Sequence, residues 1–397
     1  MHDVWITAAG AVSALGAGMG SHLEAVRSAR SGLARHELFG GKAPDPCMCG
    51  LLPAAVIEPD LDATAANRAS RVLETAVAEA LGTDSALAST CDFVVGTTLG
   101  NLHGGTCYYR GLRQDEQPDL SLVRHFLPCA PASAVCNALE IGGRRWTISS
   151  ACGSGTAALG LAYNRVRQGL STRMIAAGVD VLSPYVVAGF NSLRLVSANE
   201  CRPFDGARDG LNPGEGGAAF VVESAESARA RNAVPLAIVE GFGEALDAYH
   251  HTRAHPEGAG LVAAIRKAFA CVDATPESID HVHLHGTATR ANDTSEYHAC
   301  RTVFGPRLAS VPACSTKSMT GHTYGGAGAL SAAFCVLSIE HGIIPPTLFH
   351  RERDPEFADL AVSAKPVDGV HVGRALSLAL GFGGEAFALL LRKGDNR

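Results

Sequence analysis

The sequence is poor in charged residues, which make up 18% of its 397 positions. It also lacks any uninterrupted apolar run of about 18 residues, the length that a membrane-crossing helix needs. The net charge of -6 gives no general attraction for nucleic acid or an anionic membrane, so neither is expected as a partner. Few charges, 44 glycines and 47% hydrophobic residues disfavour a disordered or coiled-coil protein and suit a compact enzyme.

The N-terminal segment lacks the basic stretch and the continuous apolar core of a signal peptide. A cytoplasmic location is therefore expected, and with it reduced thiols in place of disulfides, although the chain has 12 cysteines. The closest pair, Cys47 and Cys49, has no second pair and no spaced histidines to complete a zinc site. We therefore predict no metal and interpret most cysteines as small core residues.

Short β-rich runs alternate with longer helical patterns along the chain. This alternation predicts an α/β fold in which buried strands are covered by helices on both sides. At 397 residues, two domains or two halves that share one core are expected. The strand-like runs are FVVG (93–96), WTISSA (146–151), MIAAG (174–178), AAFVVES (218–224), VHLHG (282–286) and ALSLALGFGG (375–384).

A glycine-rich segment occurs twice, and each copy leads into an apolar strand. GEGGAAF (214–220) and GFGGEAF (381–387) are identical at five of seven positions. The repetition favours two related α/β halves, which we assign to residues 1–245 and 246–397.

Cys152 lies in TISSACGSGTAALG (147–160), between an apolar, β-branched approach and a helix-forming run. The pattern predicts that a strand ends before this cysteine and a helix begins after it. A thiol at a helix N-terminus meets unpaired N–H groups and the positive end of the helix dipole, which favour the thiolate. Gly153 and Gly155 carry no side chains that would block an incoming group. This context favours a nucleophile over a structural cysteine.

A nucleophilic thiol usually works with a histidine from elsewhere in the chain. Among 16 histidines, His285 and His322 stand in glycine-flanked strand-to-loop settings. Lys317 precedes His322 by five residues, and Glu296 follows His285 by eleven. If this Lys and this Glu are buried, they need each other or another partner. His283, one strand step from His285, is interpreted as a packing residue.

Taken together, these motifs resemble those of β-ketoacyl-acyl-carrier-protein synthases, most closely the elongating condensing enzymes of type II fatty-acid and polyketide systems. The resemblance runs from about Val4 to the last predicted strand, with the motifs in the family's order. It implies a thiolase-like fold in which two similar halves, each with a five-stranded sheet, form an αβαβα sandwich. The segments that carry it are SSACGSGTAALG, HLHGTATRANDTSE, STKSMTGHTYGGAGAL, RPFDGARDGLNPGEGG, DAYHHTRAHPEGAG and the terminal GFGG.

The resemblance also implies roles for the residues that match the family's motifs. Cys152 would receive an acyl chain from the phosphopantetheine thioester of an acyl carrier protein. His285 and His322 would complete a Cys-His-His triad. Lys317 and Glu296 match the residues that support these histidines.

Further positions match the substrate-binding part of the family's site. The backbone amides of Cys152 and Phe382 match an oxyanion hole, and Phe382 also matches an aromatic gate that moves when the cysteine is acylated. Thr252, Thr287 and Gly383 match positions near the pantetheine arm.

The implied reaction is a decarboxylative Claisen condensation of an acyl group on Cys152 with malonyl-acyl carrier protein, which gives 3-oxoacyl-acyl carrier protein and CO2. No cofactor is expected beyond the carrier's phosphopantetheine. One alternative is a chain-length-factor-like subunit that shapes another synthase's tunnel, although such subunits typically lack the cysteine. Another alternative is a degradative thiolase or a thioester hydrolase. An arrangement of two histidines fits these enzymes less well than it fits decarboxylative condensation.

The GFGG segment is followed by Glu385 and Ala386, where many fatty-acid synthases of this type have Thr-Asn. This departure favours polyketide-type over primary fatty-acid synthesis. The resemblance further implies a homodimer or a pair with a related subunit.

Arg68 and Arg71 are predicted to dock the acidic carrier protein, because residues at i and i+3 share one face of a helix. A solvated helix face is the open alternative.

Overall fold

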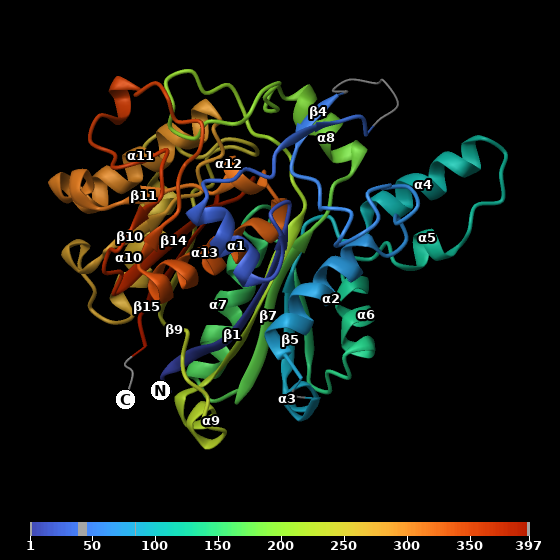
Figure 1. Ribbon diagram of the computed structural model, residues 1–397, viewed down its shortest axis with the longest axis horizontal. Coiled ribbons are helices and arrows are strands. Elements are labelled where there is room, and N and C mark those ends of the chain that lie inside the picture. The colour runs from blue at the N-terminus through green and yellow to red at the C-terminus, as the bar shows by residue number, and fades with distance from the viewer. Residues whose placement is uncertain (1, 39–45, 84, 395–397) are drawn as a thin grey trace.

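The structure, a computed structural model, describes residues 2–38, 46–83 and 85–394 (Figure 1). Its main sheet contains two sets of five strands. The first set is β1 (Val4–Ser13), β5 (Asp92–Gly96), β6 (Arg145–Ile148), β7 (Arg173–Asp180) and β8 (Gly216–Ser224). The second set is β9 (Ala237–Leu246), β10 (His281–His283), β11 (Ala313–Cys314), β14 (Arg374–Leu380) and β15 (Glu385–Arg392).

The two sets follow the same plan. The strand order is β6-β5-β7-β8-β1 in the first and β11-β10-β14-β15-β9 in the second. In each set the first three strands are parallel, and the fourth and fifth each pair antiparallel with the strand before. The two glycine-rich repeats lead into β8 and β15, the fourth strand of each set. The prediction of two related halves is therefore confirmed.

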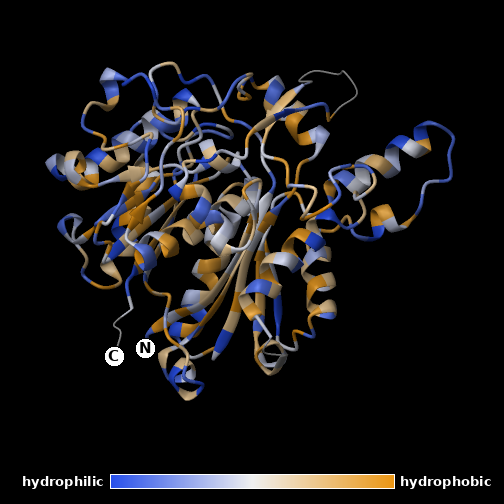
Figure 2. Cartoon of the chain, viewed as in Figure 1, coloured by the Kyte–Doolittle hydropathy of each residue, from blue (hydrophilic) through white to orange (hydrophobic). Residues whose placement is uncertain are grey.

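Two helices lie between the sets of strands. α7 (Ser154–Arg167) and α13 (Ala327–His341) pack against each other and against strands of both sets. Residues 327–339 of α13 are all buried, as expected for a helix that is apolar on every side. Apolar residues are concentrated along the strands and the helices that cover them (Figure 2).

The outer faces of the sheets are covered by further helices. α2 (Arg68–Leu81) and α6 (Ala130–Ala138) cover the first set, and α10 (Ala259–Ala270) covers the second, with α11 (Arg290–Phe304) packed on α10 (Figure 1). The five layers are those of the αβαβα sandwich that the family resemblance implied.

Close contact between α7 and α13 brings their N-terminal ends together. A Cβ at Gly155 of α7 would lie 2.8 Å from the backbone nitrogen of Ala329, and one at Gly328 of α13 would lie 2.1 Å from Thr156 Oγ1. Only glycine allows this approach. Cys152 precedes α7 and His322 precedes α13, so this contact sets the distance between them.

All six predicted strand runs contain a strand, but β1, β9 and the two-residue β11 of the main sheet were not predicted. Alanine and glycine interrupt the β-branched residues in β1 and β9, which weakens their sequence signal. β9 pairs along most of its length with β15 and, over three residues only, with β1. The division at residues 245 and 246 stays a prediction, and strand pairing groups β9 with the second half.

Shorter elements complete the described chain. α4 (Leu102–Arg113) and α5 (Ser121–Arg124) form an arm that projects from the body (Figure 1), and α8 (Pro184–Ser192) contacts α4. No helix in the described ranges is long and apolar enough to span a bilayer. The other α-helices and strands of the described chain are α1 (Met19–Arg27), β2 (Gly16–Ala17), β3 (Ala34–His36), β4 (Cys47–Cys49), α3 (Ser85–Thr90), α9 (Ala225–Ala230), α12 (Lys317–Thr320), β12 (Ile343–Ile344) and β13 (Val367–Asp368).

Candidate active site

Cys152 lies in the turn between β6 and α7, where the sequence pattern placed it. The preceding residue, Ala151, has a φ of 44°, a left-handed conformation that is strained for any residue with a side chain. The hydroxyls of Thr98 and Ser154 both donate to the carbonyl oxygen of Ala151, at 2.7 and 2.6 Å, and hold this turn. A Cβ at Gly153 would lie 2.1 Å from the ring of Phe387. The glycines beside the cysteine therefore serve packing as well as access.

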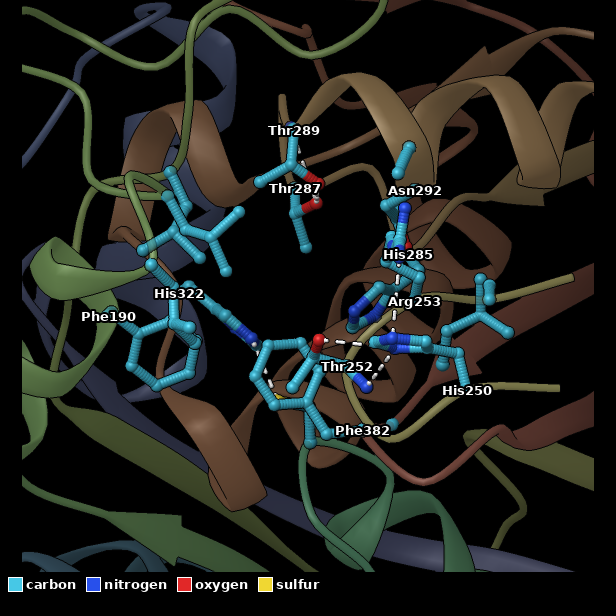
Figure 3. Close-up of a pocket in the computed structure, with 18 residues that line it drawn as sticks. Phe190, His250, Thr252, Arg253, His285, Thr287, Thr289, Asn292, His322 and Phe382 are labelled. Carbon is cyan, nitrogen blue, oxygen red and sulfur yellow. Dashed lines mark hydrogen bonds between the residues drawn. The ribbon is translucent and has the colours of Figure 1, made fainter. Parts of the chain in front are cut away.

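The structure brings Cys152, His285 and His322 together from three separate segments. His322 follows α12, and its Nε2 lies 3.1 Å from the Sγ of Cys152. His285 follows β10, and its ring centre lies 5.5 Å from that of His322, at an interplanar angle of 86°. All three side chains are buried and line one cavity of about 400 Å³ (Figure 3). A single substrate can therefore reach the sulfur and both rings.

Burial decides the protonation of these three groups. It lowers the pKa of His285 and of His322 well below the ordinary value, and the charge of Lys317 acts in the same direction. Both imidazoles are therefore neutral near pH 7. Burial raises the pKa of Cys152 to about 12, against the opposing effect of Lys317. The expectation that the helix N-terminus would favour the thiolate is wrong for the free protein, because desolvation outweighs it.

Lys317 and Glu296 both hold the backbone at His285. The Glu296 carboxylate accepts hydrogen bonds from the N–H groups of His285 and Gly286, at 2.5 and 2.8 Å. The Lys317 ammonium donates to the carbonyl oxygen of His285. Both side chains are buried; burial lowers the pKa of Lys317 and raises that of Glu296, and attraction between the two charges opposes both shifts. These contacts fix the backbone that carries the His285 side chain.

The amides that match an oxyanion hole are free to act as donors. In the part of the chain that the structure describes, neither the N–H of Cys152 nor that of Phe382 donates to a protein oxygen. Phe382 lines the cavity and stacks on Phe190, with ring centres 5.5 Å apart. Gly383 has a φ of 95°, and its N–H donates to the carbonyl oxygen of His251.

The two threonines that match the pantetheine site line the cavity (Figure 3). Thr287 Oγ1 lies 2.9 Å from Thr289 Oγ1, and the N–H of Thr252 donates to His250 Nδ1 at 3.1 Å. Gly383 is not among the residues that line the cavity, although it adjoins Phe382.

Arg68 is buried, so the prediction that it docks a carrier protein is wrong. Its guanidinium donates to both carboxylate oxygens of Glu215, at 2.8 and 2.5 Å. Spacing of i and i+3 places two residues near one another but does not say which side of the helix the core covers. Arg71 is exposed, and its docking role stays a prediction.

Replacing Arg68 with alanine is expected to lower the free energy of unfolding by about 3–5 kcal/mol, because Glu215 would remain buried without its partner. Arg71→Ala, an exposed change three residues away on the same helix, is expected to alter it by less than about 0.5 kcal/mol. Urea unfolding curves of both variants measure the difference. Equal midpoints for the two variants would show that the buried pair adds no stability.

Asp180 was not predicted, yet it ties together the loops around the site. This buried carboxylate follows the apolar run of β7, and a lone charge at the end of such a run was the available signal. Burial raises its pKa to about 6. Its oxygens accept hydrogen bonds from Thr97 Oγ1 at 2.6 Å and from the N–H groups of Thr98, Leu99 and Gly325 at 3.0, 2.9 and 2.7 Å.

Phe190 on α8 was also missed. Its ring stacks on Phe382 and packs at 5.6 Å, ring centre to ring centre, against Tyr324. No local pattern marks this residue, because its partners lie more than 130 residues away in the sequence.

The duplicated five-layer fold, with a buried cysteine facing two histidines, defines a thiolase-fold protein. Residues 53–228 match the family model "Beta-ketoacyl synthase, N-terminal domain", and residues 236–350 match "Beta-ketoacyl synthase, C-terminal domain". The two matches together cover more than half of the chain, which therefore belongs to the β-ketoacyl synthase family. The recognition made from the motifs is confirmed.

Individual relatives agree with this assignment. The chain is 36% identical over 284 residues to the tetracenomycin polyketide synthase ketoacyl synthase alpha subunit of Streptomyces glaucescens, with 70% of this chain and 66% of that protein covered. It is 36% identical over 250 residues to 3-oxoacyl-[acyl-carrier-protein] synthase 2 of Staphylococcus aureus (strain COL), with 62% of this chain and 60% of that protein covered. These matches thus span a little under two thirds of the relatives' lengths.

A solved structure covers nearly the whole chain. The ishigamide ketosynthase/chain length factor structure superimposes with a TM-score of 0.90 at 29% identity, over 99% of both chains. The fold therefore extends beyond the segments that the sequence comparisons match.

Proposed function

We propose that this protein is a 3-oxoacyl-acyl-carrier-protein synthase, which condenses an acyl group held on Cys152 with malonyl-acyl carrier protein. The observation that carries the proposal is the 3.1 Å contact between Cys152 Sγ and His322 Nε2, in a cavity that His285 also lines. A thiol with a proton acceptor can take up an acyl group. A second neutral imidazole beside it can stabilise an enolate.

The first half-reaction is acyl transfer to the cysteine. Cys152 Sγ attacks the carbonyl carbon of the acyl thioester while its proton passes to His322 Nε2. The amides of Cys152 and Phe382 donate to the oxyanion that forms. The bond from the acyl carbon to the carrier's sulfur then breaks, and the carrier thiol leaves with the proton.

The second half-reaction forms the carbon–carbon bond. Malonyl carrier protein loses CO2, and the electrons of the broken bond form an enolate whose oxygen accepts hydrogen bonds from His285 and His322. The enolate carbon attacks the acyl group on Cys152, the C–S bond breaks, and the released thiolate takes up a proton. The product is a 3-oxoacyl thioester two carbons longer than the acyl group.

His322 is suited to act in both half-reactions. Its Nδ1 is buried and has no hydrogen-bond partner among the described residues, so no second contact fixes its tautomer. Nε2 can therefore accept the thiol proton in one step and donate to the enolate in the next. Lys317 and Glu296 act as positioning residues for His285.

The carrier's pantetheine arm would reach Cys152 through the same cavity. Thr252 and Thr287 would hydrogen-bond it from the cavity wall. Gly383, next to Phe382 in the chain, completes the set proposed to bind the arm. Phe382 would act as the gate, since its ring lies on Phe190 at the cavity and would have to move to admit a longer chain.

The partners proposed for this chain are an acyl carrier protein and either a second copy or a related subunit. The name of the structural relative, a ketosynthase/chain length factor, supports a paired assembly. The named polyketide synthase relative supports polyketide-type synthesis. Since Cys152 and both histidines are retained here, the catalytic role is favoured over that of a tunnel-shaping subunit.

Incubation of the purified protein with acyl and malonyl carrier thioesters tests the proposal. The expected result is CO2 together with a 3-oxoacyl carrier product. Free acid without CO2 would indicate a thioester hydrolase. A product that forms only after a related subunit with its own active cysteine is added, and that survives loss of Cys152, would indicate the chain-length-factor role.

A further inference from the structure

Three potential metal ligands meet at the base of the α4 arm. His103 and Cys107 lie one helical turn apart on α4, at i and i+4, and therefore share a face of the helix. Asp62, in the loop before α2, approaches both of them. None of the three lines the cavity that contains Cys152. Among the described residues, this is the only group of three such side chains whose ligand atoms lie within 4.8 Å of one another.

The distances between the three ligand atoms are close to those of a zinc site. Asp62 Oδ1 lies 2.9 Å from His103 Nε2 and 3.4 Å from Cys107 Sγ, and the sulfur lies 3.7 Å from His103 Nε2. Usual Zn–S, Zn–N and Zn–O bond lengths in a tetrahedron place such atoms about 3.4–3.6 Å apart. Metal binding would open the Asp62–His103 contact, at an Asp62 side chain that is more than half exposed, and would replace the hydrogen bond from the Cys107 thiol to Asp62.

We propose that Asp62, His103 and Cys107 bind a divalent transition-metal ion, with zinc the best fit, and that water fills the fourth position. One thiolate, one imidazole and one carboxylate are ligand types that zinc accepts together, whereas magnesium and calcium prefer oxygen alone. The set is independent of the catalytic residues proposed above.

The surroundings of the three ligands suit a bound cation. His103 is buried, which fixes its ring beside the other two ligands. Arg110, one turn further along α4, donates to Asp62 Oδ2 at 2.7 Å and to Cys107 Sγ at 3.3 Å. Outer hydrogen bonds of this kind orient metal ligands. The Cys107 thiolate and the Asp62 carboxylate would together balance the two positive charges of the ion.

Cys107 is the ligand whose state a metal would change most. Its thiol donates a hydrogen bond to Asp62 Oδ1 at 3.4 Å, and a bound cation would take the place of that proton. The metal would join α4 to the loop before α2 and so stabilise the base of the arm (Figure 1).

Metal titration of chelator-treated full-length protein tests the site. Zinc is expected to bind at one equivalent per chain and to raise the melting temperature. Cobalt(II) in its place is expected to show the charge-transfer absorption of a Co–thiolate bond. Cys107→Ser should abolish this absorption, and Asp62→Asn, a change at an exposed side chain, should weaken binding by more than the about 10–100-fold typical of losing an outer partner.

Two control variants separate this site from the other thiols. Cys129→Ser removes an exposed cysteine, and Cys152→Ala removes the sulfur beside the two active-site histidines; both should keep the cobalt absorption. The proposal is overturned if the chelator-treated protein without substitutions binds no zinc or cobalt. It is also overturned if Cys107→Ser keeps the absorption, or if Cys152→Ala alone loses it, which would leave the Asp62 group as an ion-pair cluster only.

Discussion

Cys152→Ala is expected to abolish formation of 3-oxoacyl product, with a loss of activity on the order of 10⁴–10⁶-fold, as for removal of other catalytic nucleophiles. Cys152 is the only sulfur that lines the described cavity, and no other side chain there is placed to carry the acyl chain next to His322. Intact-protein mass spectrometry after incubation with acyl carrier protein should show no acylated variant.

The same variant should still release CO2 from malonyl carrier protein, because His285 and His322 remain. Cys129→Ser, which removes an exposed thiol, is the matched control and should keep full activity. Acylation of Cys152→Ala at the normal rate would place the acyl group on another residue and end the proposed mechanism.

The second large effect is expected at the histidines. His285→Ala and His322→Ala should each slow malonyl decarboxylation by about 10²–10³-fold, because each removes one donor to the enolate oxygen in a buried site. The two variants should differ in acylation of Cys152. His322→Ala should slow it, since Nε2 of this residue lies 3.1 Å from the sulfur and receives its proton. His285→Ala should leave it largely intact.

Rates of CO2 release and of acyl-enzyme formation separate these outcomes, with His371→Ala, at an exposed histidine, as the control. Wild-type decarboxylation in both active-site variants would contradict the assigned roles. Equal loss of acylation in both would instead indicate that the rings support the fold around Cys152, which a circular dichroism comparison would detect.

The sequence predicted the family, the fold, and the cysteine and two histidines that meet in the cavity, because these are carried by local motifs. The residues after β10, those after α12 and those before α7 each form a short segment with its own composition. Such segments can be recognised one at a time. The duplicated glycine-rich segment predicted the two related halves for the same reason.

Properties that depend on which atoms are buried could not be predicted in this way. Arg68 and Arg71 looked equivalent in the sequence, but only Arg68 is buried, where it pairs with Glu215, 147 residues away. The protonation state of Cys152 likewise depends on burial. A helix N-terminus is visible in the sequence, whereas the desolvation that raises the pKa of this thiol depends on everything packed around it.

By itself, the sequence determined the chemistry available to this protein: one thiol and two imidazoles in recognisable turns, and two similar halves to hold them. The tertiary structure alone decided their distances and charge states. The close contact of α7 and α13 at Gly155 and Gly328 sets the distance between the thiol and the imidazole that precede these helices, and burial determines which of the groups carry a charge. The tertiary structure also brought Asp62 to His103 and Cys107, since no spacing along a chain encodes a contact between distant segments.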